Sequence, residues 1–350
     1  MQKNLITIAG ALLASLFVPG LAFGQGSFDT VAGAKGAPRR GTITATTPVE
    51  ITLDMSGVTQ QIPVNEVTKV TLGDEPSGLT NARNAVLQKN YGNALTELEK
   101  VDPASLERDI MKQDVAFYRA FSQAKLAMTE GGNAKDAASA MFDFYKKHPN
   151  SFHFYEAAEI LGDLAVTTGK FDAAATFYGE KGLGGAPWPE YKLKGNLASG
   201  RALMLAGKHA EALTSFEGVI ASGENSADAN ALKQYAMVGK ASCLAETGKP
   251  DEGIAMLNDI IAKNDPQDAR LFARANNALG NCYLKASKPK DALMAFLKTD
   301  VLFFSDGESH AEALYRLGKL WDTVSKSDRA IAARNTLKER YAGSIWATMP

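Results

Sequence analysis

The sequence contains few of the residues on which most catalytic and metal sites depend. It has two cysteines and four histidines among 350 residues, and no Gly-x-Ser-x-Gly, His-Glu-x-x-His or P-loop string occurs. The histidines are scattered, and none has a carboxylate or a cysteine at a recognised ligand spacing. They are His148, His153, His209 and His310. The sequence therefore predicts no enzymatic activity, no cofactor and no metal site.

A strong net charge of either sign is also missing. The chain has 38 Lys and Arg residues against 39 Asp and Glu residues, which gives a formal net charge of −1. No cluster of basic residues of the kind that binds nucleic acid occurs along it. We therefore expect no nucleic acid partner. Hydrophobic residues make up 45% of the chain, which is enough for a continuous core.

One long apolar stretch occurs, and it lies at the N-terminus. Residues 5–23 carry no charge and are interrupted at Pro19, and small residues around Gly24 suit a cut before Gln25. This pattern is typical of a secretory signal peptide, although the stretch is also long enough for an uncleaved anchor. The break at Pro19 favours cleavage. We therefore expect residues 1–24 to be a signal peptide. The protein would then be exported to the periplasm or cell envelope, or be secreted, with no integral membrane segment after cleavage.

Two different segments follow this stretch. Residues 25–40 are rich in Gly, Ala and Ser and are predicted to be a flexible linker. Residues 41–73 alternate apolar and polar positions, with Thr and Val dominant and breaks near Pro48, Gly57 and Pro63. This alternation predicts a small β module of three or four short antiparallel strands.

A sheet of this size needs support from elsewhere, because a few short strands bury little apolar surface. The sequence leaves two sources open. One is a second copy of the chain in a homo-oligomer, and the other is the following helix through Leu79, Ala82 and Val86. The spacing of glycines and prolines over residues 41–72 weakly resembles a fragment of an Sm-like or SH3-like barrel.

From about residue 79 the chain repeats a spacing: a small residue, a second small residue twelve positions later, and usually a bulky residue four further on. The small pairs are Ala82 with Ala94, Gly162 with Ala174, Gly200 with Ala212, Ala241 with Gly253, Gly280 with Ala292, and Gly318 with Ala330. The bulky followers are Leu98, Tyr178, Phe216, Leu257 and Phe296, with Arg334 as the exception. Two small residues let helices cross closely, and the bulky residue fills the space beside the crossing. The spacing therefore predicts stacked helical hairpins.

A seventh copy is centred on Ala137, with one extra residue in the turn at 131–133. The copies recur every 37 to 43 residues, a period typical of a solenoid. The segments LGDLAVTTGKFDAAATFY (161–178), LGNCYLKASKPKDALMAF (279–296) and LGKLWDTVSKSDRAIAAR (317–334) resemble tetratricopeptide repeats. The resemblance implies a mainly α protein in which residues 79–346 form an α-solenoid of about seven hairpins in a right-handed superhelix. It also implies a non-catalytic scaffold that binds a protein or peptide.

In tetratricopeptide repeat proteins, the helix stripe next to the core lines a concave groove that receives extended peptides or partner helices. Carried to this sequence, the resemblance implies a groove that is acidic at one end and basic or polar beyond, and that could organise an envelope complex. Its residues are Glu156, Glu159, Asp163, Lys194, Arg201, Tyr235, Arg274, Asn277, Asn281, Tyr315 and Lys319. The alternative is that these residues form ordinary solvated faces, since charged helix faces are common.

The loop at residues 182–191 offers a second contact surface. Trp188 and Tyr191 follow four small residues and stand beside two prolines, so they could anchor a partner or simply cap a long turn. A competing function follows from the aromatic residues. Trp188, Tyr191, Tyr235 and Tyr315 could stack on sugars in an auxiliary binder of cell-wall glycan or peptide, if they gather on one exposed face.

The two cysteines, Cys243 and Cys282, occupy the same position in successive repeats, two residues after the first small residue. An exported protein permits a disulfide between them. However, packed helix axes lie about 8–10 Å apart, whereas a disulfide needs Cα atoms within about 7 Å. The sequence therefore leaves two alternatives open: a disulfide, or two small buried residues between helices.

Overall fold

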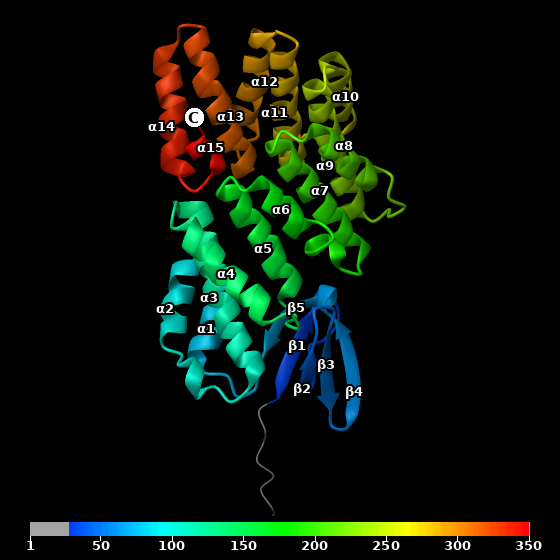
Figure 1. The fold of residues 1–350 in the computed structure, drawn as a ribbon, viewed down its shortest axis with the longest axis vertical. Helices are drawn as coiled ribbons and strands as arrows, with labels where there is room; N and C mark the ends of the chain where they lie inside the picture. The colour runs from blue at the N-terminus through cyan, green and yellow to red at the C-terminus, as the bar shows by residue number, and fades with distance from the viewer. Residues whose placement is uncertain (1–27, 350) are drawn as a thin grey trace, which may run out of the picture.

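The computed structural model describes residues 28–349, which form a small sheet followed by paired helices (Figure 1). Seven hairpins follow one another, as the repeat predicts, and the fold class is confirmed. They are α1 (Ser77–Leu87) with α2 (Tyr91–Glu99), α3 (Asp109–Glu130) with α4 (Ala134–Lys147), α5 (Phe154–Thr167) with α6 (Phe171–Tyr178), α7 (Pro189–Leu205) with α8 (His209–Ile220), α9 (Ala227–Glu246) with α10 (Pro250–Lys263), α11 (Ala269–Lys285) with α12 (Pro289–Leu302), and α13 (Gly307–Thr323) with α14 (Ser327–Arg340). The short helix α15 (Ile345–Thr348) ends the described chain. The predicted signal peptide, residues 1–24, lies outside the described residues.

In the repeats whose first small residue is a glycine, the side chain sixteen positions later explains that glycine. A Cβ atom added at Gly162 would lie 2.4 Å from the ring of Tyr178, and one at Gly280 would lie 2.6 Å from the ring of Phe296. No real Cβ approaches an atom so closely, so only glycine leaves room for the ring. In the fifth hairpin, a Cβ on Gly253 would lie 2.6 Å from the Ala241 carbonyl oxygen, which shows the close crossing of its two helices.

The turn inside most hairpins uses the left-handed backbone conformation. Gly169, Gly207 and Gly248 end their first helices with φ between 71° and 89°, as helix C-termini commonly do. In other hairpins the same position holds Lys89, Ser287 or Ser325, with φ of 56° to 59°. These three residues are not glycine, yet they adopt the left-handed conformation that glycine adopts without strain.

The β module is an open antiparallel sheet with the strand order β4-β3-β2-β1-β5. Its strands are β1 (Asp29–Gly33), β2 (Arg39–Thr46), β3 (Glu50–Met55), β4 (Val58–Pro63) and β5 (Val67–Thr71), with a 3-10 turn η1 (Val64–Glu66) before β5. The prediction of a linker over residues 25–40 is therefore wrong where β1 lies. β1 contains one large apolar residue, Val31, and its position is fixed by strands β2 and β5 on its two sides. The β module therefore begins twelve residues before the predicted boundary.

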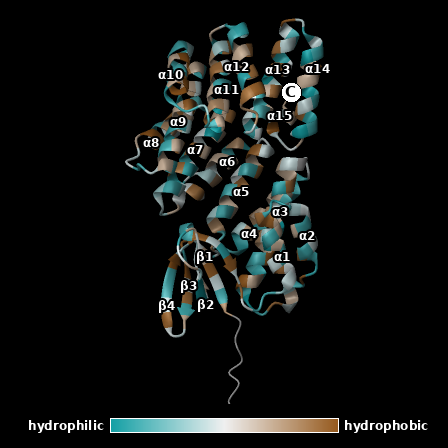
Figure 2. Ribbon diagram, turned by 180° about the vertical axis from the view of Figure 1, so that it is seen from behind, coloured by the Kyte–Doolittle hydropathy of each residue, from teal (hydrophilic) through white to brown (hydrophobic). Residues whose placement is uncertain are grey.

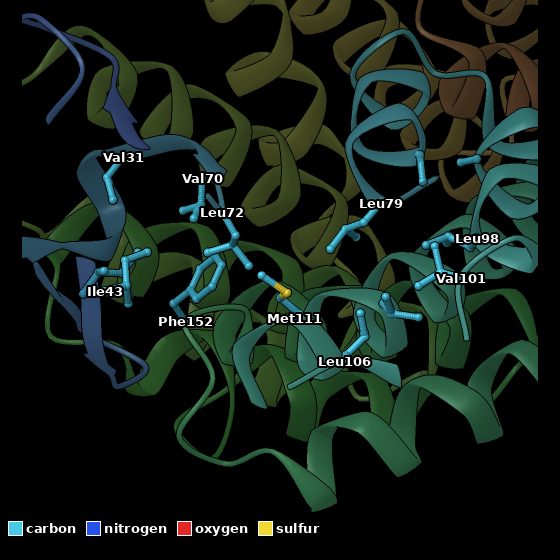
Figure 3. Close-up of a cluster of buried hydrophobic side chains, with 14 of the residues drawn as sticks. Val31, Ile43, Val70, Leu72, Leu79, Leu98, Val101, Leu106, Met111 and Phe152 are labelled. Carbon is cyan, nitrogen blue, oxygen red and sulfur yellow. The ribbon is translucent and has the colours of Figure 1, made fainter. Parts of the chain in front are cut away.

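The sheet shares one core with the first hairpins of the solenoid. Val31 and Val70 from the sheet, and Leu72 directly after β5, lie in the same buried cluster as Leu79 from α1 and Met111 from α3 (Figure 3). Of the two sources of support left open by the sequence, the structure shows the first hairpin. Support from a second copy stays a prediction.

The end of the chain returns to the second hairpin. A Cβ on Gly343 would lie 2.4 Å from the carbonyl oxygen of Met128 in α3, and one on Gly131 would lie 3.2 Å from Ala342. Figure 1 shows the loop after α14 directly above the end of α3. Trp346 of α15 packs on Tyr315 of α13, with 5.6 Å between the ring centroids. The stack is therefore closed on one side by its own C-terminal segment.

No helix among residues 28–349 combines the length and the apolar character needed to span a bilayer. Figure 2 shows hydrophilic and hydrophobic residues interspersed along the helices. Cys243 and Cys282 are both buried and free, so the structure contains two separate thiols and not the candidate disulfide. The Cys282 sulfur lies 3.8 Å from the Ala241 carbonyl oxygen, in the seam between α11 and α9.

Candidate partner-binding cavity

The inner side of the hairpins encloses a cavity of about 720 Å³, which we call the central cavity. Helices α5, α7, α9 and α11 line it, and the start of α13 and the segment after α14 close it. Six residues predicted for the groove line this cavity: Glu159, Asp163, Lys194, Arg201, Tyr235 and Arg274. Six of the eleven residues predicted for the groove therefore lie on the inner face of the stack.

Two arginines from different hairpins converge on one carboxylate in this cavity. The Glu308 carboxylate, at the start of α13, accepts a hydrogen bond from Arg201 of α7. It also accepts one of 3.3 Å from Nη2 of Arg274 in α11. Asp306 stands beside Glu308 and forms ion pairs with Arg270, at 3.5 Å, and with Arg274, at 3.8 Å. An acidic group of the chain itself thus occupies the basic part of the predicted groove.

Glu308 and Arg274 stay charged at neutral pH. Burial disfavours the charge of Glu308, but Arg201 and Arg274 outweigh it and lower the pKa of Glu308 to about 2. Burial and the neighbouring Arg201 lower the pKa of Arg274 to about 10, which still leaves it protonated at pH 7. Arg201 and Glu308 remain 38% and 47% exposed, because both side chains face the solvent in the cavity. The pair is therefore accessible to a ligand from the cavity.

The other wall of the cavity is acidic. Asp163 accepts a 2.6 Å hydrogen bond from the Tyr178 hydroxyl, and burial raises the pKa of this carboxyl to about 6. Glu159 pairs with Lys194 of the next hairpin at 2.7 Å. Tyr235 adds an aromatic surface, with the guanidinium of Arg274 5.1 Å from its ring centroid. The cavity thus offers carboxylates on one side and arginines on the other.

The remaining groove residues lie elsewhere. Asn277 is 2% exposed and donates hydrogen bonds to the Ser309 carbonyl, at 2.8 Å, and to Glu312. Asn281 donates to the same Glu312 carboxylate at 3.0 Å. The prediction that Asn277 lines an open groove is therefore wrong, because its side chain is buried between α11 and α13. Asn281 is partly exposed, lies outside the central cavity and joins the same two helices.

Glu156, Tyr315 and Lys319 also lie outside the central cavity. Glu156 lines a smaller cavity beside the β module. Tyr315 packs on Trp346, and the Lys319 ammonium lies 4.6 Å from the Tyr315 ring centroid. These three residues are thus separated from the six residues that the central cavity brings together.

Two parts of the cavity were not predicted from the sequence: the acidic residues at the start of α13 and the C-terminal wall. Asp306 carries a helix-start signal, because its side chain accepts the Ser309 N–H at 3.3 Å as an N-cap. That signal places Glu308 in the first turn of a helix. It does not show that Glu308 reaches Arg201, which lies 107 residues earlier in the chain.

The loop aromatics pack against the solenoid. Trp188 and Tyr191 are partly buried, with ring centroids 5.0 Å apart, and both contact Tyr155 of α5. Tyr235 lies in the central cavity, and Tyr315 lies near the C-terminus. The four aromatic residues of the glycan hypothesis therefore lie in three places.

Two of the four histidines have hydrogen-bond partners on both ring nitrogens. His153 is buried between Asp114, at 3.2 Å, and Glu156, at 3.3 Å. His310 lies between the Tyr341 hydroxyl, at 2.7 Å, and Asp300, at 2.8 Å. Within residues 28–349, no group of His, Cys, Asp and Glu side chains is arranged to hold a metal ion.

Comparisons with known proteins concern the helical part. A family model described as tetratricopeptide repeat matches residues 197–269 and 241–300. A tetratricopeptide repeat protein from Parabacteroides merdae has a similar solved structure, with a TM-score of 0.56 and 16% identity over 75% of this chain and 92% of that chain. No curated protein matches the sequence.

Two further structures are less similar. The quorum sensor NprR from B. thuringiensis has a TM-score of 0.49 and 11% identity, over 75% of this chain and 86% of its own. A Rap protein complexed with competence and sporulation factor has a TM-score of 0.48 and 13% identity, over 77% and 74%. The family-model match over residues 197–300 and the structure with a TM-score of 0.56 together show that the hairpins have a tetratricopeptide-like arrangement.

Proposed function

We propose that this protein is an exported, non-enzymatic scaffold that holds a segment of a protein or peptide partner in the central cavity. One observation carries the proposal: Arg201 and Arg274, from separate hairpins, point to the same place in a solvent-accessible cavity. Its volume of about 720 Å³ lies within the range of about 300–1,000 Å³ typical of ligand pockets. The tetratricopeptide repeat fold is typically a binding scaffold.

The chemistry of the cavity indicates an acidic partner segment. Guanidinium groups bind carboxylates with directed, charge-assisted hydrogen bonds. Glu308 occupies the place that a carboxylate of the partner would take. Because Arg201 and Glu308 are both more than one-third exposed, their pairing contributes little to stability, and a partner carboxylate can replace it.

The charge along the cavity would orient the bound segment. A carboxylate of the partner would lie at Arg201 and Arg274, and its basic groups would face Glu159 and Asp163. Glu308 and Asp306 make this charge difference smaller than the predicted stripe alone indicates. Electrostatics of this kind affects the association rate more than the final affinity.

The experiment is affinity capture from envelope extract with the mature protein and with the double variant Arg201→Glu plus Arg274→Glu. We expect the wild type to capture a partner that the double variant captures in smaller amount. The association of this partner with the wild type should slow as the salt concentration rises. The control, Lys147→Glu plus Lys263→Glu, makes the same charge change at side chains 70% and 72% exposed outside the cavity. Equal association rates for all three proteins would contradict the proposal.

Export is the second part of the proposal. The uncharged stretch at 5–23 and the small residues before Gln25 support a cleaved signal peptide and a role in the periplasm or envelope. Mass spectrometry of the protein from its native cell should give a mature N-terminus near Gln25 in a non-cytoplasmic fraction. Intact Met1 in soluble cytoplasm would contradict export.

A further inference from the structure

A second cavity, of about 350 Å³, lies where the β module meets the solenoid, and we call it the junction cleft. Four consecutive residues of β5 line it, from Val67 to Val70. Successive side chains of a strand point to opposite faces of the sheet, so a strand can line a cavity with four in a row only along its edge. β5 is the last strand in the order β4-β3-β2-β1-β5, and β1 pairs with its other edge. The cleft therefore contains an open strand edge.

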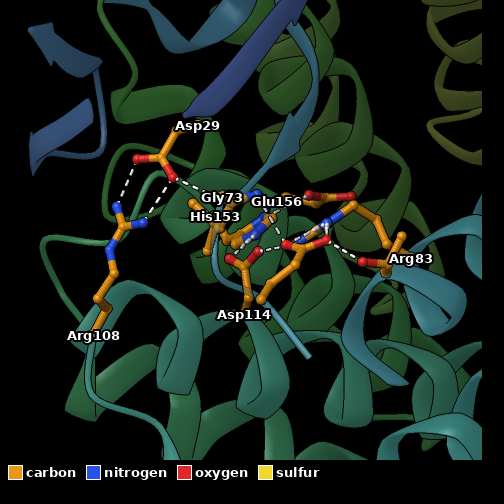
Figure 4. A network of polar contacts seen from close by, with 10 residues as sticks. Asp29, Gly73, Arg83, Arg108, Asp114, His153 and Glu156 are labelled. Carbon is orange, nitrogen blue, oxygen red and sulfur yellow. Dashed lines mark hydrogen bonds and ion pairs between the residues drawn. The ribbon is translucent and has the colours of Figure 1, made fainter. Parts of the chain in front are cut away.

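A buried arginine lines this cleft and has one donor without a partner. Arg83 of α1 is 2% exposed and bonds Glu75 at 2.7 Å and Asp114 at 2.7 Å through its two terminal nitrogens (Figure 4). Its Nε–H is buried and has no hydrogen-bond partner. A buried donor without a partner is costly, so a ligand that supplies an acceptor oxygen would be favoured here.

The charged groups around the cleft already neutralise one another. Besides the Arg83 pairs, His153 lies between Asp114 and Glu156, and Lys194 pairs with Glu159 at 2.7 Å. Lys69 of β5 differs, since its ammonium donates to the uncharged side chain of Asn84. A cleft with balanced charges does not select an ion. It favours a ligand with local dipoles and no net charge.

The remaining walls are apolar and aromatic. Val67, Val86 and Leu87 form one side, and Tyr155 and Tyr191, whose rings stack at 6.3 Å, form another. Such walls accept aliphatic or aromatic side chains.

We infer that the junction cleft binds a short, extended, uncharged peptide segment that adds as a strand to the free edge of β5. A peptide main chain matches each feature of the cleft. Its alternating N–H and C=O groups fit a strand edge, one carbonyl oxygen can accept from Arg83 Nε, and alternate side chains can enter the apolar walls. The site is distinct from the central cavity, although Glu159, Leu183 and Lys194 line both and separate them.

The probe is a pool of hexapeptides with acetylated and amidated ends, built from Ala, Val, Thr and Tyr, added to the mature protein. We expect hydrogen exchange to slow at residues 67–71. Because the peptides are uncharged, the dissociation constant should change less than about twofold between 50 and 500 mM salt. This response differs from the one expected of an acidic segment in the central cavity.

Leu87→Trp tests the position of the site. Leu87 is 59% exposed at the rim of the cleft, so a larger side chain there should block entry and weaken binding at least about tenfold. The control is Leu302→Trp on α12, at a leucine 63% exposed outside the cleft, and it should bind like the wild type.

The other outcomes overturn the inference. They are the absence of peptide binding, peptide binding that Leu87→Trp does not weaken, and protection from hydrogen exchange confined to α7, α11 and α13. The third outcome would leave the proposed function standing. In the absence of peptide, protection of residues 67–71 that rises with protein concentration would also overturn it, because a second copy of the chain would then occupy the cleft.

Discussion

The ring of Phe216 lies between two glycines of different hairpins. A Cβ on Gly200, in the same hairpin, would lie 2.8 Å from this ring, and a Cβ on Gly239, in the next hairpin, would lie 2.5 Å from it. Neighbouring hairpins therefore approach each other through an aromatic residue that takes the space of two missing side chains. This contact packs one hairpin of the repeat against the next.

Gly239→Ala should destabilise the protein, since the added methyl overpacks the seam beside Phe216. We expect a loss of roughly 1–3 kcal/mol in the free energy of unfolding, measured with urea. Gly218→Ala on α8 is the matched control, because nothing lies within 4 Å of the new Cβ. It should stabilise by about 0.5–1 kcal/mol, as alanine does in a helix. Similar shifts in both variants would contradict the account of the repeat.

Asp163 should make stability depend on pH. Burial raises its pKa from 3.8 to about 6 in the folded protein, so between these values the folded state holds a proton that the unfolded state has released. Its contribution is therefore greatest below about pH 4 and is lost as the pH rises through 6. Asp163→Asn should remove this part of the slope in urea unfolding between pH 4 and 8. Asp143→Asn, at a carboxylate 65% exposed on α4, should keep it.

At the scale of elements, one carboxylate attaches the sheet to the solenoid. Asp29 of β1 accepts two hydrogen bonds from Arg108, at 2.7 and 2.6 Å, and others from the N–H groups of Ile43 and Gly73. Burial disfavours its charge, but Arg108 and these donors outweigh it and lower the pKa of Asp29. The stability it supplies is therefore present at neutral pH and lost in acid.

Asp29→Asn should release the β module before the hairpins unfold. Removing one partner of a largely buried pair costs about 3 kcal/mol, and strands β1, β2 and β5 should lose protection from hydrogen exchange first. Asp109→Asn is the control, since its carboxylate is 88% exposed and pairs with Lys112 at 3.5 Å. It should change stability by less than about 0.5 kcal/mol. Uniform loss of protection along the whole chain would argue against a separable module.

The two kinds of element were not equally predictable from the sequence. The hairpins depend on spacings of 12 and 16 residues within one chain segment, so their number and order are predictable. Strand β1 has only Val31 as a large apolar residue, and its place depends on strands that follow it. Glu308 was unpredictable for a related reason, because its contact with Arg201 depends on how far the whole stack curves.

At the scale of the whole molecule, the contact between the C-terminal segment and α3 turns an open stack into a closed one. An open solenoid is stabilised by neighbour contacts alone, so damage to one repeat stays local. Here Gly343 against Met128 joins the seventh hairpin to the second. The closure also completes the wall of the central cavity.

Gly343→Ala should open this closure, because the new Cβ would lie 2.4 Å from a backbone oxygen that has little room to move. Hydrogen exchange should rise at residues 127–131 and 341–346 together, although these segments are far apart in the chain. Gly92→Ala on α2 is the control, since it has open space around its Cβ. A rise at only one of the two segments would show that they do not hold each other.

The same closure sets an order of events during synthesis. The second hairpin and Arg201 leave the ribosome well before the segment that completes the cavity. The 107 residues between Arg201 and Glu308 take roughly 5–20 s to make at about 5–20 residues per second. During that time Arg201 has no Glu308 beside it, and the last wall does not yet exist. A nascent chain thus presents Arg201 on an open surface, whereas the finished molecule presents it in a solvent-accessible cavity that already contains Glu308.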